Sequence, residues 1–199
     1  MFDKDESTRE DIKHMLRVQV GDMQAFEAIV LKYQKPIFNF FRKMGADSEL
    51  AEDLAQQTFL KLWKSVDNYF PKGKFSTYLF QIGKNEFINE YLKKKKRKEV
   101  SLNGNNGFDD TNSEYQFEAD DESVEDKISR DETVEIIRSA VKKLDEKHRM
   151  VFVLAHFQDL KYADIAKILE IPLGTVKTRM MHAEHKLREI LKNQINSVN

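Results

Sequence analysis

YADIAKILEIPLGTVKTRMMHAEHKLREIL, residues 162–191, predicts two helices joined by a tight turn. In its first half, apolar residues recur at the three- and four-residue spacing of one buried helix face: Tyr162, Ile165, Ala166 and Leu169. The second half carries a matching stripe: Val176, Met180, Ala183, Leu187 and Ile190. Pro172 stands where a helix tolerates proline best, at its first position. This pattern is typical of a helix-turn-helix whose second helix enters a DNA major groove, although a plain antiparallel helix pair remains the alternative.

Several polar side chains of the second helix lie off the apolar stripe and are candidates for DNA contacts. Lysine and threonine can bind phosphates and base edges, and an exposed methionine can contact a thymine methyl group. The candidates are Thr175, Lys177, Thr178, Met181, His182 and Lys186.

The composition of the 199 residues excludes several classes of protein. Without cysteine there is neither a disulfide framework nor a thiolate metal site. The charged N-terminus and the lack of an apolar run of about 18 residues predict a cytoplasmic protein without membrane insertion. We expect no metal, cofactor or catalytic residue, because only His182 and His185 show a ligand-like spacing and no phosphate-binding glycine loop is present.

Charge is strongly segregated along the chain. Residues 1–98 carry a net charge of +5, residues 99–132 a net charge of −10, and residues 133–199 a net charge of +4. Each basic block can approach a polyanion, whereas the acidic block repels one. The acidic block is also poor in apolar residues, which predicts a flexible linker between two modules.

Two helices are expected early in the N-terminal block, after about a dozen loose residues. The first begins after Asp22, is interrupted or kinked at Pro36 and ends at Gly45. The second follows Asp47 and has one side of mixed charge, amide and leucine. That side suits a protein partner, although an ordinary solvated face is equally compatible. It includes Asp53, Gln57, Leu60, Lys61 and Lys64.

Residues 67–75, DNYFPKGKF, interleave aromatic and lysine side chains in a short loop. Single-stranded nucleic acid binds such surfaces, because bases stack on aromatic rings while phosphates pair with ammonium groups. The alternative is that the rings are buried in the core. The loop candidates are Tyr69, Phe70, Lys72, Lys74 and Phe75. A long helix from Ser76 follows and continues into KKKKRK, residues 93–98, with Lys84, Asn85 and Asn89 on a polar side suited to tracking phosphates.

The C-terminal block adds two more helices before the helix-turn-helix. Val134, Ile137, Val141 and Leu144 have helical spacing, and Asp145 is expected to cap the next helix. No segment alternates with a period of two. The sequence therefore predicts an all-α fold: two helical domains joined by a flexible acidic linker, with a four-helix C-terminal domain.

Two blocks of motifs, in this order, resemble the extracytoplasmic-function (ECF) sigma factors of bacterial RNA polymerase. The first block comprises AEDLAQQTFLKLW and FSTYLFQIGKN, and the second comprises YADIAKILEIPLGTVKTR and KLREIL. The resemblance implies that residues 14–98 are sigma region 2 and residues 133–192 are sigma region 4, with residues 99–132 as the linker between them.

The resemblance also implies partners. Core RNA polymerase would bind region 2 through its β′ clamp helices and region 4 through its β flap. Residues 67–98 would capture and melt the minus-ten element of promoter DNA, and the helix from Pro172 would bind the minus-thirty-five element. An anti-sigma factor is expected to hold such a protein inactive. The candidate contacts to the clamp helices are Asp53, Gln56, Gln57, Leu60 and Lys61.

Some positions depart from the common pattern of the family. Glu170 stands in the turn where glycine is usual, and His182 and Glu184 stand where arginine is frequent. We therefore expect the minus-thirty-five contact to depend on Lys177, Thr178, Arg179 and Lys186. A dimeric helix-turn-helix regulator that never joins polymerase is the alternative, but it leaves the N-terminal block unexplained. An adaptor that contacts only proteins leaves residues 67–75 and the lysine run unexplained.

Overall fold

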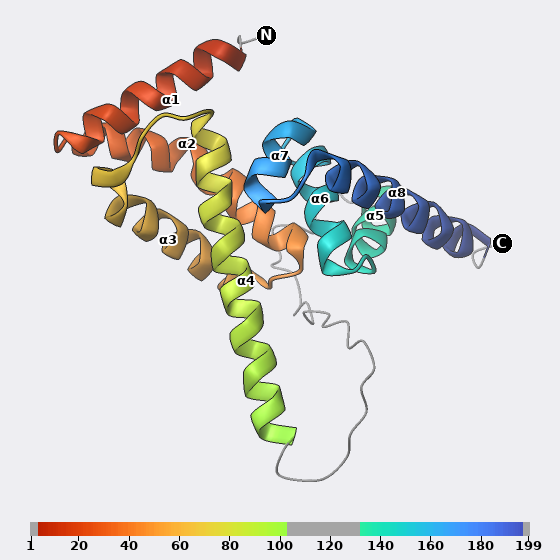
Figure 1. Ribbon diagram of the computed structural model, residues 1–199. Helices are drawn as coiled ribbons and strands as arrows, with labels where there is room; N and C mark the ends of the chain where they lie inside the picture. The colour runs from red at the N-terminus through yellow and green to blue at the C-terminus, as the bar shows by residue number, and fades with distance from the viewer. Residues whose placement is uncertain (1–3, 103–131, 197–199) are drawn as a thin grey trace.

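The computed structural model describes residues 4–102 and 132–196, and within these ranges all regular structure is helical (Figure 1). Helices α1 to α4 form an N-terminal unit, and α5 to α8 form a C-terminal unit. The α-helices are α1 (Lys4–Gln19), α2 (Met23–Met44), α3 (Ser48–Lys64), α4 (Phe75–Leu102), α5 (Glu132–Lys142), α6 (Glu146–His156), α7 (Tyr162–Leu169) and α8 (Leu173–Asn196). A short 3-10 helix, η1 (Val66–Asn68), follows α3. The predicted all-α fold class is confirmed.

Residues 4–19 form helix α1, whereas the sequence predicted that the first dozen residues are loose. Asp11 is buried within it, accepting a hydrogen bond from the Tyr33 hydroxyl at 2.6 Å and pairing with Lys32, both on α2. Met15 is fully buried on the same side. The prediction of a loose segment was wrong. These two buried residues, Asp11 and Met15, lie one helical turn apart, but one of them is charged and many of their neighbours are charged too, so the sequence shows no apolar periodicity.

The expected helix ends are confirmed. Asp22, Asp47 and Asp145 each accept a hydrogen bond from the backbone N–H three residues later, at 3.1, 2.7 and 3.2 Å. Gly45 ends α2 with φ of 102°, a left-handed conformation that glycine adopts without steric cost. These four short-range signals fix where α2, α3 and α6 begin and where α2 ends.

Pro36 does not interrupt α2, contrary to one expectation from the sequence. A proline inside a helix costs about 3 kcal/mol, because it removes one backbone hydrogen bond and crowds the preceding turn. Ile37, Phe40, Phe41 and Met44 follow it and are all fully buried, so packing of this half of α2 compensates for the loss. The helix therefore continues to Met44.

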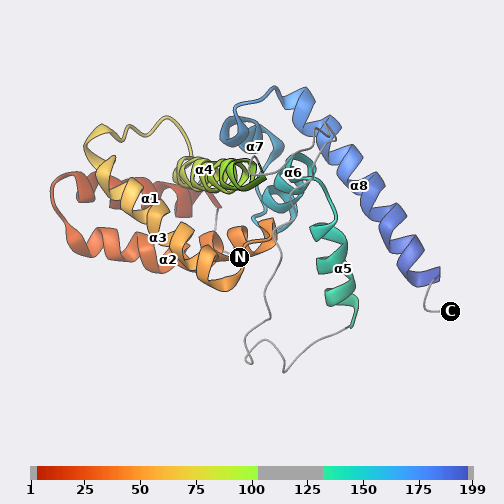
Figure 2. The same ribbon diagram turned by 90° about the horizontal axis from the view of Figure 1, so that it is seen from below.

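The two units pack against each other, with α7 lying along α4 and α6 against α2 (Figures 1 and 2). The buried apolar residues of both units form one continuous cluster. Helix α4 extends through Leu102, four residues into the expected linker, and α5 begins at Glu132. The rest of the expected linker, residues 103–131, lies outside the described residues.

Candidate nucleic-acid interface

The helix-turn-helix is formed by α7, a tight turn and α8. Glu170 occupies the turn with φ of 57° and ψ of 40°, so the left-handed conformation expected there is kept by a residue other than glycine. Pro172 precedes α8 by one residue instead of opening it, and its carbonyl accepts a hydrogen bond from Val176 N–H at 3.2 Å. The apolar stripe of α8 is buried from Val176 to Leu187 and half-buried at Ile190, which directs the opposite side of its N-terminal half outward.

The candidate DNA-binding residues of α8 divide into an exposed and a half-buried set. Lys177, Thr178, Met181 and His182 are exposed, and Met181 keeps 58% of its surface accessible. Thr175, Arg179 and Lys186 are half-buried. The Thr178 hydroxyl donates to the Gly174 carbonyl at 3.0 Å, so in this arrangement it can act toward DNA as a hydrogen-bond acceptor.

Lys186 and His182 belong to a polar cluster at the start of α6. Lys186 Nζ donates to Asp145 Oδ2 at 2.9 Å, and the His148 ring, also bonded to Asp145, lies 5.7 Å from the His182 ring, centroid to centroid. Burial raises the pKa of Asp145, but hydrogen bonds from Lys186 and from the side chain and backbone of His148 outweigh this and lower the pKa to about 2. Lys186 is thus held toward α6.

The aromatic loop presents one ring and buries two. Phe70 is 70% exposed, whereas Tyr69 is 6% exposed and Phe75 is completely buried. The Gln19 amide donates to the carbonyls of Val66 and Tyr69 at 2.9 and 2.8 Å, which ties the loop to α1. Neither Tyr69 nor Phe75 can stack on a base without leaving the core. Base stacking by this loop therefore depends on Phe70.

The lysines expected to bind DNA differ in their surroundings. Lys72 is exposed at the tip of the loop, and Asn85 and Asn89 are exposed on α4. Lys74 pairs instead with Asp164 of α7 at 2.8 Å, and Lys84 pairs with Glu170 at 3.2 Å. Lys84 was expected on one polar side with Asn85 and Asn89, but it points toward the C-terminal unit. The sequence pattern gave no sign of the partner carboxylates, because they lie 90 and 86 residues away in the chain.

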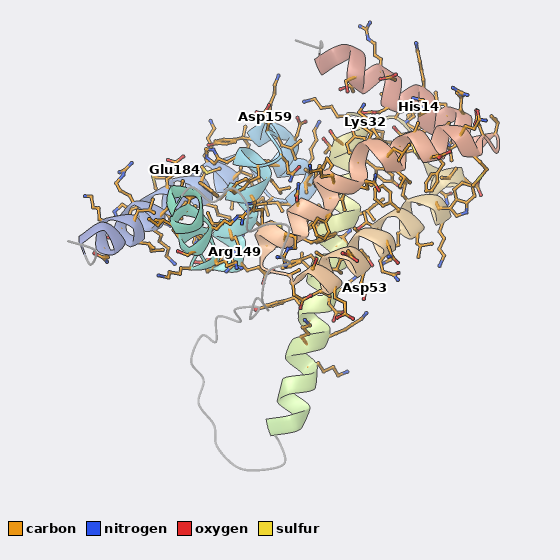
Figure 3. The ribbon with its side chains drawn as sticks, turned by 180° about the vertical axis from the view of Figure 1, so that it is seen from behind. His14, Lys32, Asp53, Arg149, Asp159 and Glu184 are labelled. Carbon is orange, nitrogen blue, oxygen red and sulfur yellow. The ribbon has the colours of Figure 1, made fainter. Side chains whose placement is uncertain are left out.

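The outward side of α3 carries all five residues predicted to contact a protein. Asp53, Gln56, Gln57, Leu60 and Lys61 are exposed, and Asp53 points away from the core (Figure 3). Trp63 extends the same side with 40% of its surface accessible and its ring edge-on to Phe26 at 5.0 Å. The sequence reasoning missed Trp63, although its place one turn after Leu60 was a sufficient signal.

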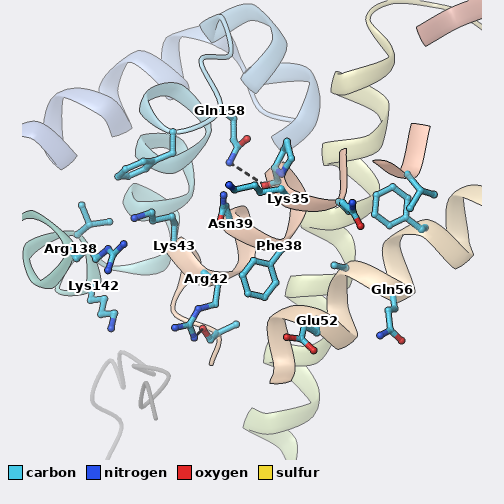
Figure 4. A pocket seen from close by; sticks show the side chains of 18 residues that line it. Lys35, Phe38, Asn39, Arg42, Lys43, Glu52, Gln56, Arg138, Lys142 and Gln158 are labelled. Carbon is cyan, nitrogen blue, oxygen red and sulfur yellow. Dashed lines mark hydrogen bonds between the residues drawn. The ribbon is translucent and has the colours of Figure 1, made fainter. Parts of the chain in front are cut away.

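A groove of about 1050 Å³ runs between the two units (Figure 4). One wall comes from α2 and α3 and includes Phe38, Arg42 and Phe59, and the other comes from α5 and α6 and includes Arg138 and Phe157. Gln158 donates to the Pro36 carbonyl across it at 3.3 Å. Because its walls belong to different units, the groove exists only while the units are docked.

Within the described ranges, no cluster of three histidine or acidic side chains could hold a metal ion. No described helix is both long and apolar enough to span a membrane.

Comparisons with known proteins identify both units. The family model described as Sigma-70 region 2 matches residues 29–97, and the model described as Sigma-70, region 4 matches residues 134–187. The ECF RNA polymerase sigma factor SigW of Bacillus subtilis is 34% identical over 92% of this chain and 95% of its own length. The RNA polymerase sigma-H factor of Pseudomonas aeruginosa is 31% identical over 88% of this chain and 91% of its own.

Two solved structures have a similar fold. The chain resembles CnrH, solved in complex with the cytosolic domain of CnrY, with a TM-score of 0.67 and 22% identity over 92% of this chain and 98% of that one. It also resembles the sigma factor RpoE, solved with the anti-sigma factor NepR from Bartonella quintana, with a TM-score of 0.64 and 24% identity over 85% and 98% of the two chains.

Proposed function

Because this chain belongs to the sigma-70 family, in its ECF group of RNA polymerase sigma factors, we propose a role for each of its surfaces in promoter-specific transcription initiation. Sigma factors bind core RNA polymerase and direct it to promoters. The polymerase supplies the chemistry, and this chain selects the start site. We assign region 2 to residues 14–98, the linker to residues 99–132 and region 4 to residues 133–192.

The polymerase contact of region 2 is the outward side of α3. Charged and amide side chains are exposed there together with a leucine. A helix face that meets only water has no need of an exposed leucine, whereas a protein interface can bury it. Asp53, Gln56, Gln57, Leu60 and Lys61 meet the β′ clamp helices, and Trp63 extends the contact. Region 4 docks on the β flap.

The minus-ten contact is the loop at 67–75 with α4. Phe70 stacks on an unpaired base, and Lys72, Asn85 and Asn89 lie along the strand that carries it. Lys74 and Lys84 join them once they are released from their carboxylate partners. Tyr69 and Phe75 contribute as buried supports that hold Phe70 outward.

The minus-thirty-five contact is the N-terminal half of α8. Lys177, Thr178, Met181 and His182 are exposed and address groove edges and phosphates. Thr175 and Arg179 flank them, and Lys186 lies at the margin because it is bonded to Asp145. We assign most of the phosphate affinity to the lysine and arginine side chains, whose ammonium and guanidinium groups bind phosphates directly.

An anti-sigma factor is a further partner in this proposal. The sigma factor RpoE, whose fold is similar to that of this chain, was solved in complex with the anti-sigma factor NepR, and this supports the proposal. The partner would meet the chain in the cytoplasm, where the polymerase acts. A protein captured from host lysate must also block promoter-directed transcription in a purified assay to be accepted as this partner.

The match of two sigma regions, in order, on one chain carries the proposal, since a dimeric helix-turn-helix regulator needs only the second. Run-off transcription on a promoter library with core polymerase and the purified chain tests it. We expect transcripts that core polymerase alone does not produce. Failure to bind core polymerase at low salt would favour the dimeric regulator.

A further inference from the structure

Two lysines assigned above to promoter DNA are occupied by carboxylates of the other unit. Lys74 Nζ lies 2.8 Å from Asp164 Oδ2, and Lys84 Nζ lies 3.2 Å from Glu170 Oε1. Gln81 Nε2 donates to the same Glu170 oxygen at 2.9 Å. A DNA phosphate bound by these lysines would have to take the places of the two carboxylates.

Both carboxylates come from α7, the first helix of the helix-turn-helix. Asp164 lies in the first turn of α7 and Glu170 caps its end, so α7, which lies beside α4 (Figure 2), has an acidic group at each end. The side chain of Lys84 is only 8% exposed beneath this contact. Helix α7 thus covers part of the surface of α4 as well as neutralising it.

The backbone at Glu170 gives an independent reason to assign a role to its side chain. With φ of 57° it adopts a conformation that is unfavourable for residues with a Cβ and open to glycine. The turn needs this conformation but does not need a carboxylate. The Glu170 carboxylate accepts hydrogen bonds from Gln81 and Lys84, which both lie on α4 and lower its pKa. The contact between units explains the glutamate where the turn alone does not.

The docked arrangement is also incompatible with simultaneous binding of both promoter elements. Elements centred near minus ten and minus thirty-five are about 25 base pairs apart, which is about 85 Å of duplex. Here the turn before α8 touches α4 through Glu170. The 29 residues between Leu102 and Glu132 span at most about 100 Å when extended, so the covalent connection permits the separation that promoter binding requires.

We infer that Asp164 and Glu170 of region 4 act as an internal substitute for DNA phosphates, masking the promoter-melting surface of region 2 until the units separate. The inference rests on the proposed function, because it concerns the regulation of the same surface. Masking lowers the affinity of the free chain for DNA, and the polymerase overcomes it by holding the two regions apart. Promoter binding thereby becomes dependent on prior binding to polymerase.

The test measures separation and DNA binding on the full chain. The chain lacks cysteine, so cysteines introduced at the exposed positions Glu27 and Lys192 accept a donor and an acceptor dye specifically. The double variant Asp164→Asn with Glu170→Gln is compared with Glu189→Gln, which removes an exposed carboxylate of α8 far along the helix from Glu170. The DNA probe is a labelled single strand carrying the nontemplate minus-ten segment of a promoter that the chain transcribes.

We expect lower energy transfer in the double variant and an affinity for the probe about three- to tenfold higher than that of the unmodified chain, with Glu189→Gln near the unmodified value. Equal transfer and equal affinity in the double variant and the control would overturn the inference. A second arm joins cysteines at positions 81 and 170 with a short bis-maleimide. Loss of probe binding on crosslinking supports masking, and undiminished binding overturns it. A chain that transcribes normally yet shows no masking refutes this inference alone, whereas a chain inactive with core polymerase refutes the proposed function.

Discussion

Arg149 of α6 donates through Nη1 to the backbone carbonyl of Met44 at 2.8 Å, and so joins region 4 to the last residue of α2. Its Nη2 donates to the carbonyls of Leu144, at 2.6 Å, and of Lys142, the last residue of α5. The residue is 5% exposed. One buried guanidinium therefore satisfies carbonyls at the ends of two helices, where the helix dipole favours a positive charge.

The variant Arg149→Met should lower the free energy of unfolding by about 2–4 kcal/mol, because three carbonyls, two of them in buried hydrogen bonds, lose a charged donor. Urea unfolding followed by circular dichroism measures the loss. Arg188→Met, which removes an exposed arginine of α8, is the matched control and should change stability by no more than about 0.5 kcal/mol. Similar losses in both variants would show that the buried carbonyl contacts contribute little.

Leu60→Glu should weaken binding to core polymerase about tenfold or more, because Leu60 lies at the centre of the proposed clamp-helix surface and is 50% exposed. Fluorescence anisotropy of the labelled chain titrated with core polymerase gives the affinity. Leu31→Glu places the same charge at a 62% exposed leucine on α2 and should bind as the unmodified chain does. If Leu31→Glu weakened binding to core polymerase as much as Leu60→Glu does, the contact with polymerase would not be specific to α3.

Phe70→Ala should reduce open-complex formation about tenfold while leaving closed-complex binding within about twofold, since stacking on an unpaired base contributes about 1–3 kcal/mol only after melting. Permanganate probing of unpaired thymines measures opening, and gel retardation at low temperature measures closed-complex binding. Leu16→Ala, at a half-exposed residue of α1, serves as the control. If open-complex formation and closed-complex binding fell by the same factor, Phe70 would support the conformation of the loop and would not stack on a base.

Short-range signals predicted the helices well, and long-range contacts limited the site prediction. Caps at Asp22, Asp47 and Asp145 act within three residues, so their positions in the sequence suffice to place helix starts. Pro36 misled because its local cost was evident while the burial of the phenylalanines after it was not. Helix α1 was missed for the same reason, since Asp11 depends on partners on α2.

The candidate site shows the same limit. The face of α3 and the exposed half of α8 follow from helical periodicity, and the structure exposes them as expected. In the loop, composition could not tell which ring is exposed, because burial of Tyr69 and Phe75 depends on α1 and α2. The pairing of Lys74 and Lys84 with α7 depends on how two units dock, which periodicity within a helix does not encode.

Glu170 should respond differently to glycine and alanine. Glycine relieves a left-handed conformation that costs about 1–2 kcal/mol, whereas the ion pair that is lost is weak because the glutamate side chain is more than half exposed to water. We therefore expect Glu170→Gly to be as stable as the unmodified chain or more stable, and Glu170→Ala to be less stable. Thermal unfolding gives the order. If the Glu170→Ala variant were as stable as the Glu170→Gly variant, the turn would carry no backbone strain.

Asp145 should make stability depend on pH in the acidic range. Its pKa is about 2 in the folded chain against an ordinary 3.8, so the folded state favours the ionised form. The stabilisation is complete above about pH 4 and is lost as the pH falls from about 4 to about 2. Because the carboxylate is partly solvated, we expect it to contribute about 1 kcal/mol to the free energy of unfolding.

The variant Asp145→Asn retains a helix-capping side chain but removes the charge paired with Lys186 and His148. Urea unfolding at several pH values should therefore show a difference between the two proteins that is present at pH 5 and vanishes near pH 2. A difference that persists unchanged at pH 2 would mean that the capping hydrogen bond, and not the charge of Asp145, stabilises the start of α6.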